Sequence, residues 1–287
     1  MLNIGIIGDI KLLEPYINHI RKNNNAQIVG KSSVGINAQS DTFHFTIPEF
    51  NRVELIDRSD VLLINNFSII RFSVLCDIIK KSKHIFTTVY PDLSLEECSH
   101  LVKLTNEAKS TFQFLNPLLY LPAIQWLGKN IKFPAYIDIS YFNKLPDNNL
   151  LKLLSMLKGM TGSGSRKIGA VLYNGNQEHQ TEFNNIRFQF GDGSIINLNY
   201  GNLESLNEFI IKVYSENQFV SLNFNSKSFL CNNTPIDLKS FSQDNELDIF
   251  LDTVNGKNKE ITDIEDYLTI IESVEEINKK ISQFSGQ

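Results

Sequence analysis

The sequence predicts an α/β protein with a doubly wound parallel sheet in residues 1–117 and an α+β domain with an open, mostly antiparallel sheet in residues 118–287. The first half alternates short, nearly continuous apolar runs with segments of helical periodicity, as expected for strands buried on both faces of a parallel sheet. The second half changes to long segments in which apolar and polar residues alternate, which is typical of strands with one solvated face. The boundary is expected near Asn116-Pro117.

The first half repeats a strand followed by a helix. Strands are predicted at 2–7, 26–30, 60–65, 84–88 and 111–115, and helices at 12–21, 53–57, 72–81 and 94–109. The last of these helices has a clear start, because Ser94 followed three residues later by Glu97 is a capping box. Strands that alternate with helices at this pitch form βαβ units, which together build a Rossmann-like sheet.

The second half is dominated by alternating strands, predicted at 136–142, 181–190, 194–200, 209–215 and 219–224. The Asp-Gly pair in Gly191-Asp192-Gly193 lies between two such runs and indicates a hairpin. Residues 161–167 are rich in glycine and serine but lack the Walker spacing, so we interpret them as a flexible connector. Amphipathic helices at 246–254 and 263–283 complete the predicted domain.

Charge and hydrophobic patterning exclude several classes of partner. A formal net charge of −5 and a pI near 5.6 argue against a nucleic-acid surface, which needs clustered Lys and Arg. No apolar run reaches the roughly 20 residues that cross a bilayer, so no membrane partner is expected. Met1 leads directly into a strand rather than into a charged and apolar leader, which favours a cytoplasmic location. Cys76, Cys98 and Cys231 are too far apart for a metal cluster or a disulfide framework.

Several short motifs occur in a characteristic order along the chain. They are Asn3-Ile4-Gly5-Ile6-Ile7-Gly8, Lys83-His84-Ile85-Phe86, Leu93-Ser94-Leu95-Glu96-Glu97, Phe250-Leu251-Asp252-Thr253-Val254-Asn255-Gly256 and the segment 262–276. With these motifs the chain resembles the glucose-fructose oxidoreductase, inositol dehydrogenase and MocA (Gfo/Idh/MocA) family. The resemblance implies a two-domain, NAD(P)-dependent oxidoreductase of a sugar or related alcohol, with oligomers formed through the open C-terminal sheet.

The positions that would bind the cofactor depart from the family pattern. By resemblance they are Gly8, Asp9, Ile10, Ser33, Asn65, Asn66 and Thr88. The family carries G-x-G-x-x-G or G-x-G-x-x-A after its first strand, with the second glycine leaving room for the pyrophosphate. Here Ile10 and Leu13 replace the second and third glycines, and Ser33 replaces the acidic residue that binds the ribose. Because the branched side chain of Ile10 would obstruct the pyrophosphate, no NAD(P) cofactor is expected.

The family's acid–base residues are also missing. Val89 stands where the family's EKP motif has its lysine, and Asn149 and Lys152 stand where a later motif has histidine and aspartate. Val89 has no proton to give or take. Tyr90, Lys144 and Lys152 are conceivable substitutes, but packed aromatics and solvated lysines are much the commoner roles. We therefore assign no catalytic residue, and no histidine has a partner at metal-ligand spacing.

The leading hypothesis is a catalytically degenerate relative of these oxidoreductases. It would bind no NAD(P) and could keep a sugar-like small molecule in the cleft between its domains. It would form homo-oligomers through the C-terminal sheet, on the alternating face of Phe188, Phe190, Ile196 and Leu198.

Two alternatives stay open. The first is an active NAD(P)-dependent oxidoreductase of a sugar or polyol, with a non-standard cofactor loop and a substitute base. The second is an interaction protein whose cleft is closed by the bulky side chains of Ile10, Leu13, Val89 and Tyr90.

Overall fold

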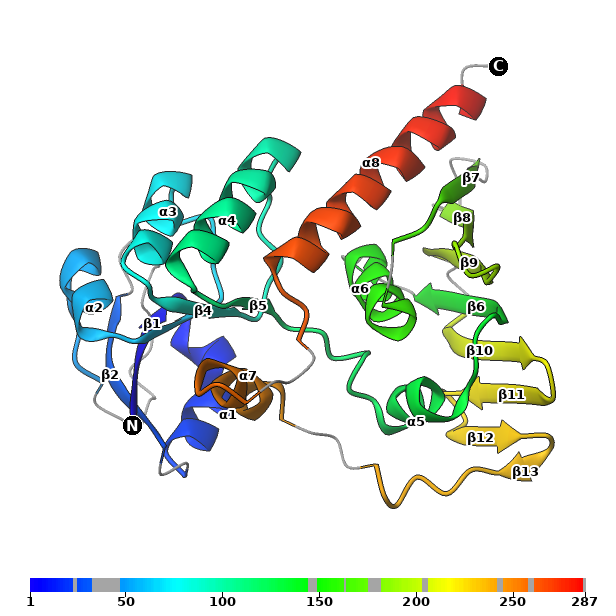
Figure 1. Cartoon of the computed structure of the whole chain (residues 1–287), viewed down its shortest axis with the longest axis horizontal. Helices are drawn as coiled ribbons and strands as arrows, with labels where there is room; N and C mark the ends of the chain where they lie inside the picture. Colours follow the sequence, from blue (N-terminus) through cyan, green and yellow to red (C-terminus); the bar gives the residue numbers. More distant parts are fainter. Residues whose placement is uncertain are drawn as a thin grey trace. The chain divides into compact units, whose positions relative to one another are not determined.

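The computed structural model divides the chain into two compact units, one made of Met1–Leu115 with Asp244–Leu268 and the other of Asn116–Gln243 with Thr269–Gln287 (Figure 1). It describes residues 1–22, 25–32, 47–143, 149–162, 164–174, 182–202, 206–241, 245–257 and 261–285. The chain leaves the first unit after Leu115 and returns to it near residue 244. The expected second domain, 118–287, did not include this return.

The first unit contains a five-stranded parallel sheet in the order β2-β1-β3-β4-β5. Its strands are β1 (Leu2–Ile7), β2 (Ala26–Ser32), β3 (Val61–Ile64), β4 (His84–Thr87) and β5 (Phe112–Phe114). Its helices are α1 (Ile10–Ile20), α2 (Arg52–Arg58), α3 (Phe72–Lys80), α4 (Leu95–Ala108) and α7 (Glu246–Val254). Helices α3 and α4 lie on one face of the sheet, and α1 and α7 lie on the other, which confirms the predicted doubly wound architecture (Figure 1).

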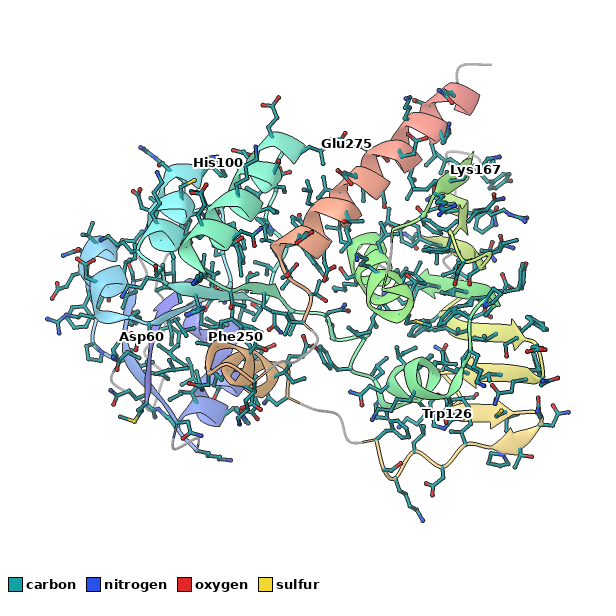
Figure 2. All side chains as sticks on the ribbon, in the orientation of Figure 1. Asp60, His100, Trp126, Lys167, Phe250 and Glu275 are labelled. Carbon is teal, nitrogen blue, oxygen red and sulfur yellow. The ribbon has the colours of Figure 1, made fainter. Side chains whose placement is uncertain are left out.

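Helix α7 is an integral part of the first unit's core. Leu247, Phe250 and Leu251 are buried together with strand residues of β1, β3 and β4 and with the inner side of α1. The Phe250 ring, labelled in Figure 2, lies 5.3 Å from that of Phe86 in β4. At the surface, Nε2 of His19 on α1 lies 2.8 Å from a carboxylate oxygen of Asp248 on α7. The amphipathic pattern of this helix is therefore satisfied by the first unit.

The second unit contains an eight-stranded sheet in the order β13-β12-β11-β10-β6-β9-β8-β7. Its strands are β6 (Tyr136–Asn143), β7 (Lys167–Asn174), β8 (Glu182–Gln189), β9 (Ile195–Asn202), β10 (Glu208–Ser215), β11 (Gln218–Asn223), β12 (Ser228–Cys231) and β13 (Thr234–Pro235). Among the described strand pairs of this second sheet, only β6–β9 is parallel. The predicted open and mostly antiparallel sheet is thus confirmed.

One face of this sheet is covered by α5 (Pro122–Asn130), α6 (Asn149–Thr161) and the part of α8 (Ile264–Ser285) that follows Leu268. Phe188, Phe190, Ile196 and Leu198 point to this face and are at most 9% exposed. The expected oligomer surface made of these four side chains is therefore wrong. A period of two shows that a strand has two faces, but it does not show which face the helices cover.

Candidate functional site

The carboxyl end of the first sheet is where a ligand is expected in a doubly wound fold. The chain leaves β1 toward β2 and β3 toward β4 in opposite directions, so β1 and β3 flank a topological switch point. The structure brings Gly8, Asp9 and Ile10, which follow β1, together with Asn65, which follows β3. Ser33, the predicted ribose position, lies outside the described residues.

The side-chain amide of Asn65 is bonded to the backbone of Asp9 at both of its polar groups. The Asp9 N–H donates to Oδ1 of Asn65 at 2.8 Å, and Nδ2 of Asn65 donates to the Asp9 carbonyl at 2.7 Å. Asn65 is only 6% exposed, so these bonds are largely shielded from water. The Asn65 amide, which was predicted to contact a cofactor, therefore bonds the backbone of the protein itself.

Gly8 is required by this arrangement. Its φ of +133° is a backbone conformation that residues with a side chain rarely adopt. A Cβ atom at this position would lie 1.7 Å from Oδ1 of Asn65. The glycine predicted as part of a cofactor loop thus leaves room for the Asn65 amide.

Asp9 caps helix α1 with its own carboxylate. Its Oδ1 accepts the Lys11 N–H at 2.8 Å, which satisfies one of the free N–H groups of the first helical turn. The positive end of the helix dipole favours a carboxylate at this place. In dinucleotide-binding folds, the same helix end receives the pyrophosphate. Here a negative charge of the chain already lies there.

The residues at the second and third glycine positions belong to the packing of α1. Leu13 is completely buried, and Ile10 packs partly buried against the same core cluster. A glycine at the third position would let helix and strand approach closely, whereas the Leu13 side chain fills that space. The Ile10 side chain therefore packs partly against the core instead of lying entirely over the turn that follows β1.

The positions after β3 and β4 are also occupied by local bonds. Oδ1 of Asn66 accepts both the N–H and the hydroxyl of Ser68, at 2.9 and 2.6 Å. The hydroxyl of Thr87 donates to the Val89 carbonyl at 2.7 Å, and the N–H of Thr88 donates to the Ile64 carbonyl at 3.2 Å. Val89, which replaces the family's lysine, is 38% exposed and offers an apolar surface.

Tyr90 has a packing role within the first unit. Its ring stacks on those of Phe114 and Tyr267, at centroid distances of 6.1 and 5.8 Å. Its hydroxyl donates to the Leu115 carbonyl at 3.1 Å. The neighbouring Tyr267 donates its hydroxyl to the Pro91 carbonyl, and burial raises the pKa of Tyr267. These contacts favour the packing interpretation of Tyr90 over that of a substitute acid.

The positions of the second catalytic motif lie on α6. Asn149 is the first residue of this helix and Lys152 is half-buried within it, whereas Lys144 lies outside the described residues. Within the described ranges, no three His, Cys, Asp or Glu side chains are grouped as a metal would require. Burial raises the pKa of Cys98 to about 11, so this thiol is protonated at neutral pH.

The remaining histidines have structural surroundings where they are described. Nδ1 of His84 accepts the Thr111 N–H at 3.0 Å, and burial lowers the pKa of His84. His100 packs against the ring of Phe72. His44 and His179 lie outside the described residues. Among the helices that can be described, none is long and apolar enough to cross a membrane.

Comparison with known proteins gives structural matches only. No protein-family model matches the chain, and no curated protein does. UDP-N-acetylglucosamine 3-dehydrogenase GnnA from Acidithiobacillus ferrooxidans matches with a TM-score of 0.83 at 14% identity, over 99% of this chain and 98% of GnnA.

Two further structures match at similar identity. The WlbA dehydrogenase from Bordetella pertussis, in complex with NADH and UDP-GlcNAcA, has a TM-score of 0.77 at 12% identity over 97% of this chain and 96% of its own. Biliverdin reductase from Synechocystis sp. PCC 6803, in complex with biliverdin and NADP+, has a TM-score of 0.71 at 16% identity over 98% and 99%. Identities this low show the fold alone. That fold is the fold of Gfo/Idh/MocA-type NAD-dependent dehydrogenases, as the sequence motifs predicted.

Proposed function

We propose that this chain is a catalytically degenerate relative of these dehydrogenases that does not hold NAD(P) at the carboxyl end of its first sheet. The observation that carries the proposal is the Asn65 amide, which bonds both the N–H and the carbonyl of Asp9. A pyrophosphate would have to displace this amide to reach the Asp9 N–H. The buried groups left without partners would cost about 1–3 kcal/mol each.

The Asp9 carboxylate adds electrostatic repulsion. Two like unit charges about 4 Å apart repel by about 4 kcal/mol at an effective dielectric of about 20, or roughly a thousandfold in affinity. Asp9 is partly exposed, so solvent screening reduces this figure to a fraction of its value. The residues present at this edge therefore do not fit a dinucleotide pyrophosphate.

The acid–base positions support loss of catalysis. Val89 carries no ionisable group, and the Tyr90 hydroxyl is bonded to a backbone carbonyl within an aromatic stack. Hydride transfer to or from an alcohol needs a group that accepts or donates the hydroxyl proton. Neither side chain provides one.

A sugar-like small-molecule ligand remains part of the proposal. It is supported by the WlbA match, whose structure contains UDP-GlcNAcA as well as NADH. A chain that has lost the dinucleotide could still bind the sugar-bearing ligand alone. Calorimetric titration of the full chain with UDP-N-acetylglucosamine tests this directly. If no heat of binding is measured at millimolar ligand, the proposed sugar-like ligand is wrong.

Homo-oligomers through the C-terminal sheet are proposed on its uncovered face. Tyr136, Val171, Tyr173 and Tyr214 point to this face and are 38–60% exposed. Between them runs an amide ladder in which Nδ2 of Asn185 donates to Oδ1 of Asn199 at 2.7 Å. Tyrosine is enriched in protein interfaces, because its ring is apolar and its hydroxyl finds a hydrogen-bond partner. Sedimentation of the full chain is expected to show a dimer that Tyr214→Glu dissociates.

Titration with NADH and NADPH, followed by fluorescence, tests the central proposal. The full chain is expected to show no saturable binding at micromolar coenzyme. Saturable micromolar binding, together with turnover of a UDP-sugar or polyol, would establish the active oxidoreductase instead. Saturable binding without turnover would overturn only the loss of NAD(P) and leave the loss of catalysis standing.

A further inference from the structure

Strand β7 forms an unprotected edge of the second sheet. Within the described part of the chain, it pairs with β8 only, through eight residue pairs from Lys167 to Asn174. Between Ile168 and Tyr173 it contains neither proline nor a charged residue. Proteins usually protect an exposed strand edge with such residues, because free backbone N–H and C=O groups pair with other chains.

A groove lies between helix α8 and the start of this strand, together with the three residues that precede the strand. It is a cavity of about 380 Å³, lined on the strand side by residues 164–168. Thr269, Glu272, Ser273, Glu276 and Lys280 line the helix side. These five residues recur at helical spacing, so they form one face of α8. All of these residues belong to the second unit.

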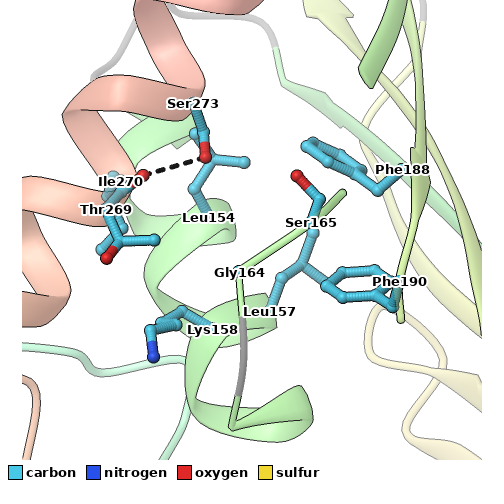
Figure 3. A pocket seen from close by; sticks show the side chains of 10 residues that line it. All are labelled: Leu154, Leu157, Lys158, Gly164, Ser165, Phe188, Phe190, Thr269, Ile270 and Ser273. Carbon is cyan, nitrogen blue, oxygen red and sulfur yellow. Dashed lines mark hydrogen bonds between the residues drawn. The ribbon is translucent and has the colours of Figure 1, made fainter. Parts of the chain in front are cut away.

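Next to the groove is a hollow with a mainly apolar lining. This smaller hollow of about 30 Å³ shares Gly164, Ser165, Thr269 and Ser273 with the groove. Most of its lining is apolar (Figure 3): Leu154 and Leu157 of α6, Phe188 of β8, Phe190 just after β8, and Ile270 of α8, with Lys158 of α6 beside them. Ser273 bonds back to the Thr269 carbonyl at 2.9 Å, so its hydroxyl does not hold the groove closed. These five apolar side chains are at most 9% exposed, so an apolar side chain in the groove would lie against the rim of this hollow.

The charges along the groove favour an acidic partner. Arg166, Lys167 and Lys280 face two carboxylates, Glu272 and Glu276. Glu276 and Lys280 pair with each other at 3.2 Å, which leaves the two cations at the start of β7 against one carboxylate. The cationic side chains at the strand's start are exposed (Lys167 is labelled in Figure 2).

We infer that the groove between β7 and α8 binds an extended acidic peptide, which adds to the free edge of β7 as a further strand. In this binding mode, main-chain hydrogen bonds give affinity and side-chain pockets give specificity. One large apolar side chain of the peptide lies over the hollow lined by Phe188 and Phe190, and acidic side chains lie beside Arg166 and Lys167.

The dimensions of the groove agree with a short strand. From Thr269 to Lys280, α8 rises by about 16 Å at 1.5 Å per residue, which equals about five residues of extended chain. A second copy of this chain fits less well, because its own segment 166–174 starts with Arg166 and Lys167 and contains no acidic residue. Two cationic strand ends do not complement a groove whose lining is already cationic.

A library of ten-residue peptides displayed on phage, selected against the full-length chain, tests this inference. The expected result is enrichment of sequences with one large apolar residue flanked by Asp or Glu. A synthetic peptide with the enriched sequence is then measured by fluorescence polarisation. Lys167→Glu is expected to weaken its binding at least about tenfold, since an attractive charge becomes repulsive. Lys132→Glu, an exposed lysine outside the groove lining, serves as the matched control.

Two further readouts separate strand addition from general charge attraction. Amide exchange along 168–173 is expected to slow when the peptide binds. Ser273→Trp, which fills the groove, is expected to abolish binding in a protein that still unfolds cooperatively. Failure to enrich any such sequence, or equal losses for Lys167→Glu and Lys132→Glu, would overturn the inference. So would a β7-dependent dimer that Lys167→Glu dissociates without any peptide binding.

Discussion

The carboxyl edge of the first sheet and the β7 edge of the second sheet differ in how their backbone groups are satisfied. At the first, the Asn65 amide and the Asp9 carboxylate bond N–H and carbonyl groups where the dehydrogenase fold would receive a coenzyme. At the second, the described chain leaves one side of β7 without a pairing strand beside a groove. The comparison teaches that side chains of the chain itself can bond the backbone at a fold's usual ligand position, whereas β7 has a pairing strand on one side only in the described part of the chain.

The largest expected effect comes from making one substitution at both edges. Gly8→Ala is expected to lower the free energy of unfolding by about 3 kcal/mol, because of its positive φ and the collision with Asn65. Gly169→Ala in β7, where an added Cβ meets nothing within 4 Å, is expected to stabilise by up to about 0.5 kcal/mol. Urea unfolding of both variants measures the difference. Equal free energies of unfolding would contradict the close contact between Gly8 and the Asn65 amide.

Removing the amide itself comes next. Asn65→Ala is expected to cost about 2 kcal/mol, because both polar groups of the Asp9 backbone lose their partner. Asn66→Ala is the matched control: the Asn66 amide oxygen bonds the exposed Ser68, so this substitution should cost about 0.5 kcal/mol. If equilibrium unfolding shows that Asn66→Ala lowers the free energy of unfolding as much as Asn65→Ala does, the two bonds between Asn65 and the Asp9 backbone have no special role.

Removing the Asp9 charge and the Asn65 amide tests whether they keep NADH from the carboxyl edge of the first sheet. Asp9→Asn removes the negative charge but keeps a residue that caps a helix well. In combination with Asn65→Ala, it is expected to raise NADH affinity by at least about tenfold over the unsubstituted chain. Asp57→Asn, an exposed carboxylate on α2, is the charge control. No gain in the fluorescence titration would mean that other features of the edge exclude the dinucleotide.

The smallest expected effect concerns the opposite end of the first sheet. Burial lowers the pKa of His84 below its ordinary value of 6.5, so the folded chain binds fewer protons there than the unfolded chain. The free energy of unfolding should therefore be fully retained above about pH 6.5 and should fall as the pH drops below it. In His84→Asn, whose Oδ1 can still accept the Thr111 N–H, this slope should flatten between about pH 5 and 7. An unchanged slope would assign it to other groups.

Much of the fold could be predicted from the sequence, because periodicity and capping act locally. Helix α7 has the predicted bounds, and both bonds of the Ser94–Glu97 capping box are present. Strand β7 was not predicted, since the glycine- and serine-rich residues before it suggested only a connector. The burial of Phe188 could not be predicted either, because covering one face of a sheet is a long-range event.

The candidate site was predicted by position but not by role. Gly8 and Asn65 were identified by their resemblance to cofactor positions of the family, and the structure brings them into contact. The bond from Asn65 to the Asp9 backbone joins residues 56 positions apart, so no local pattern shows it. The sequence did contain one indication. Asn65 lies at the switch point near Gly8, and an asparagine there can bond the protein's own backbone as well as a ligand.

Helix α7 has a consequence for how the protein is made. Leu247, Phe250 and Leu251 of this helix complete the core of a unit whose five strands all lie before Leu115. During synthesis, the entire eight-stranded sheet therefore emerges from the ribosome before the earlier unit can bury its apolar surface. For that interval, the core residues of the N-terminal unit that pack against α7 lack their cover, and transiently exposed apolar surface of this kind is prone to aggregation.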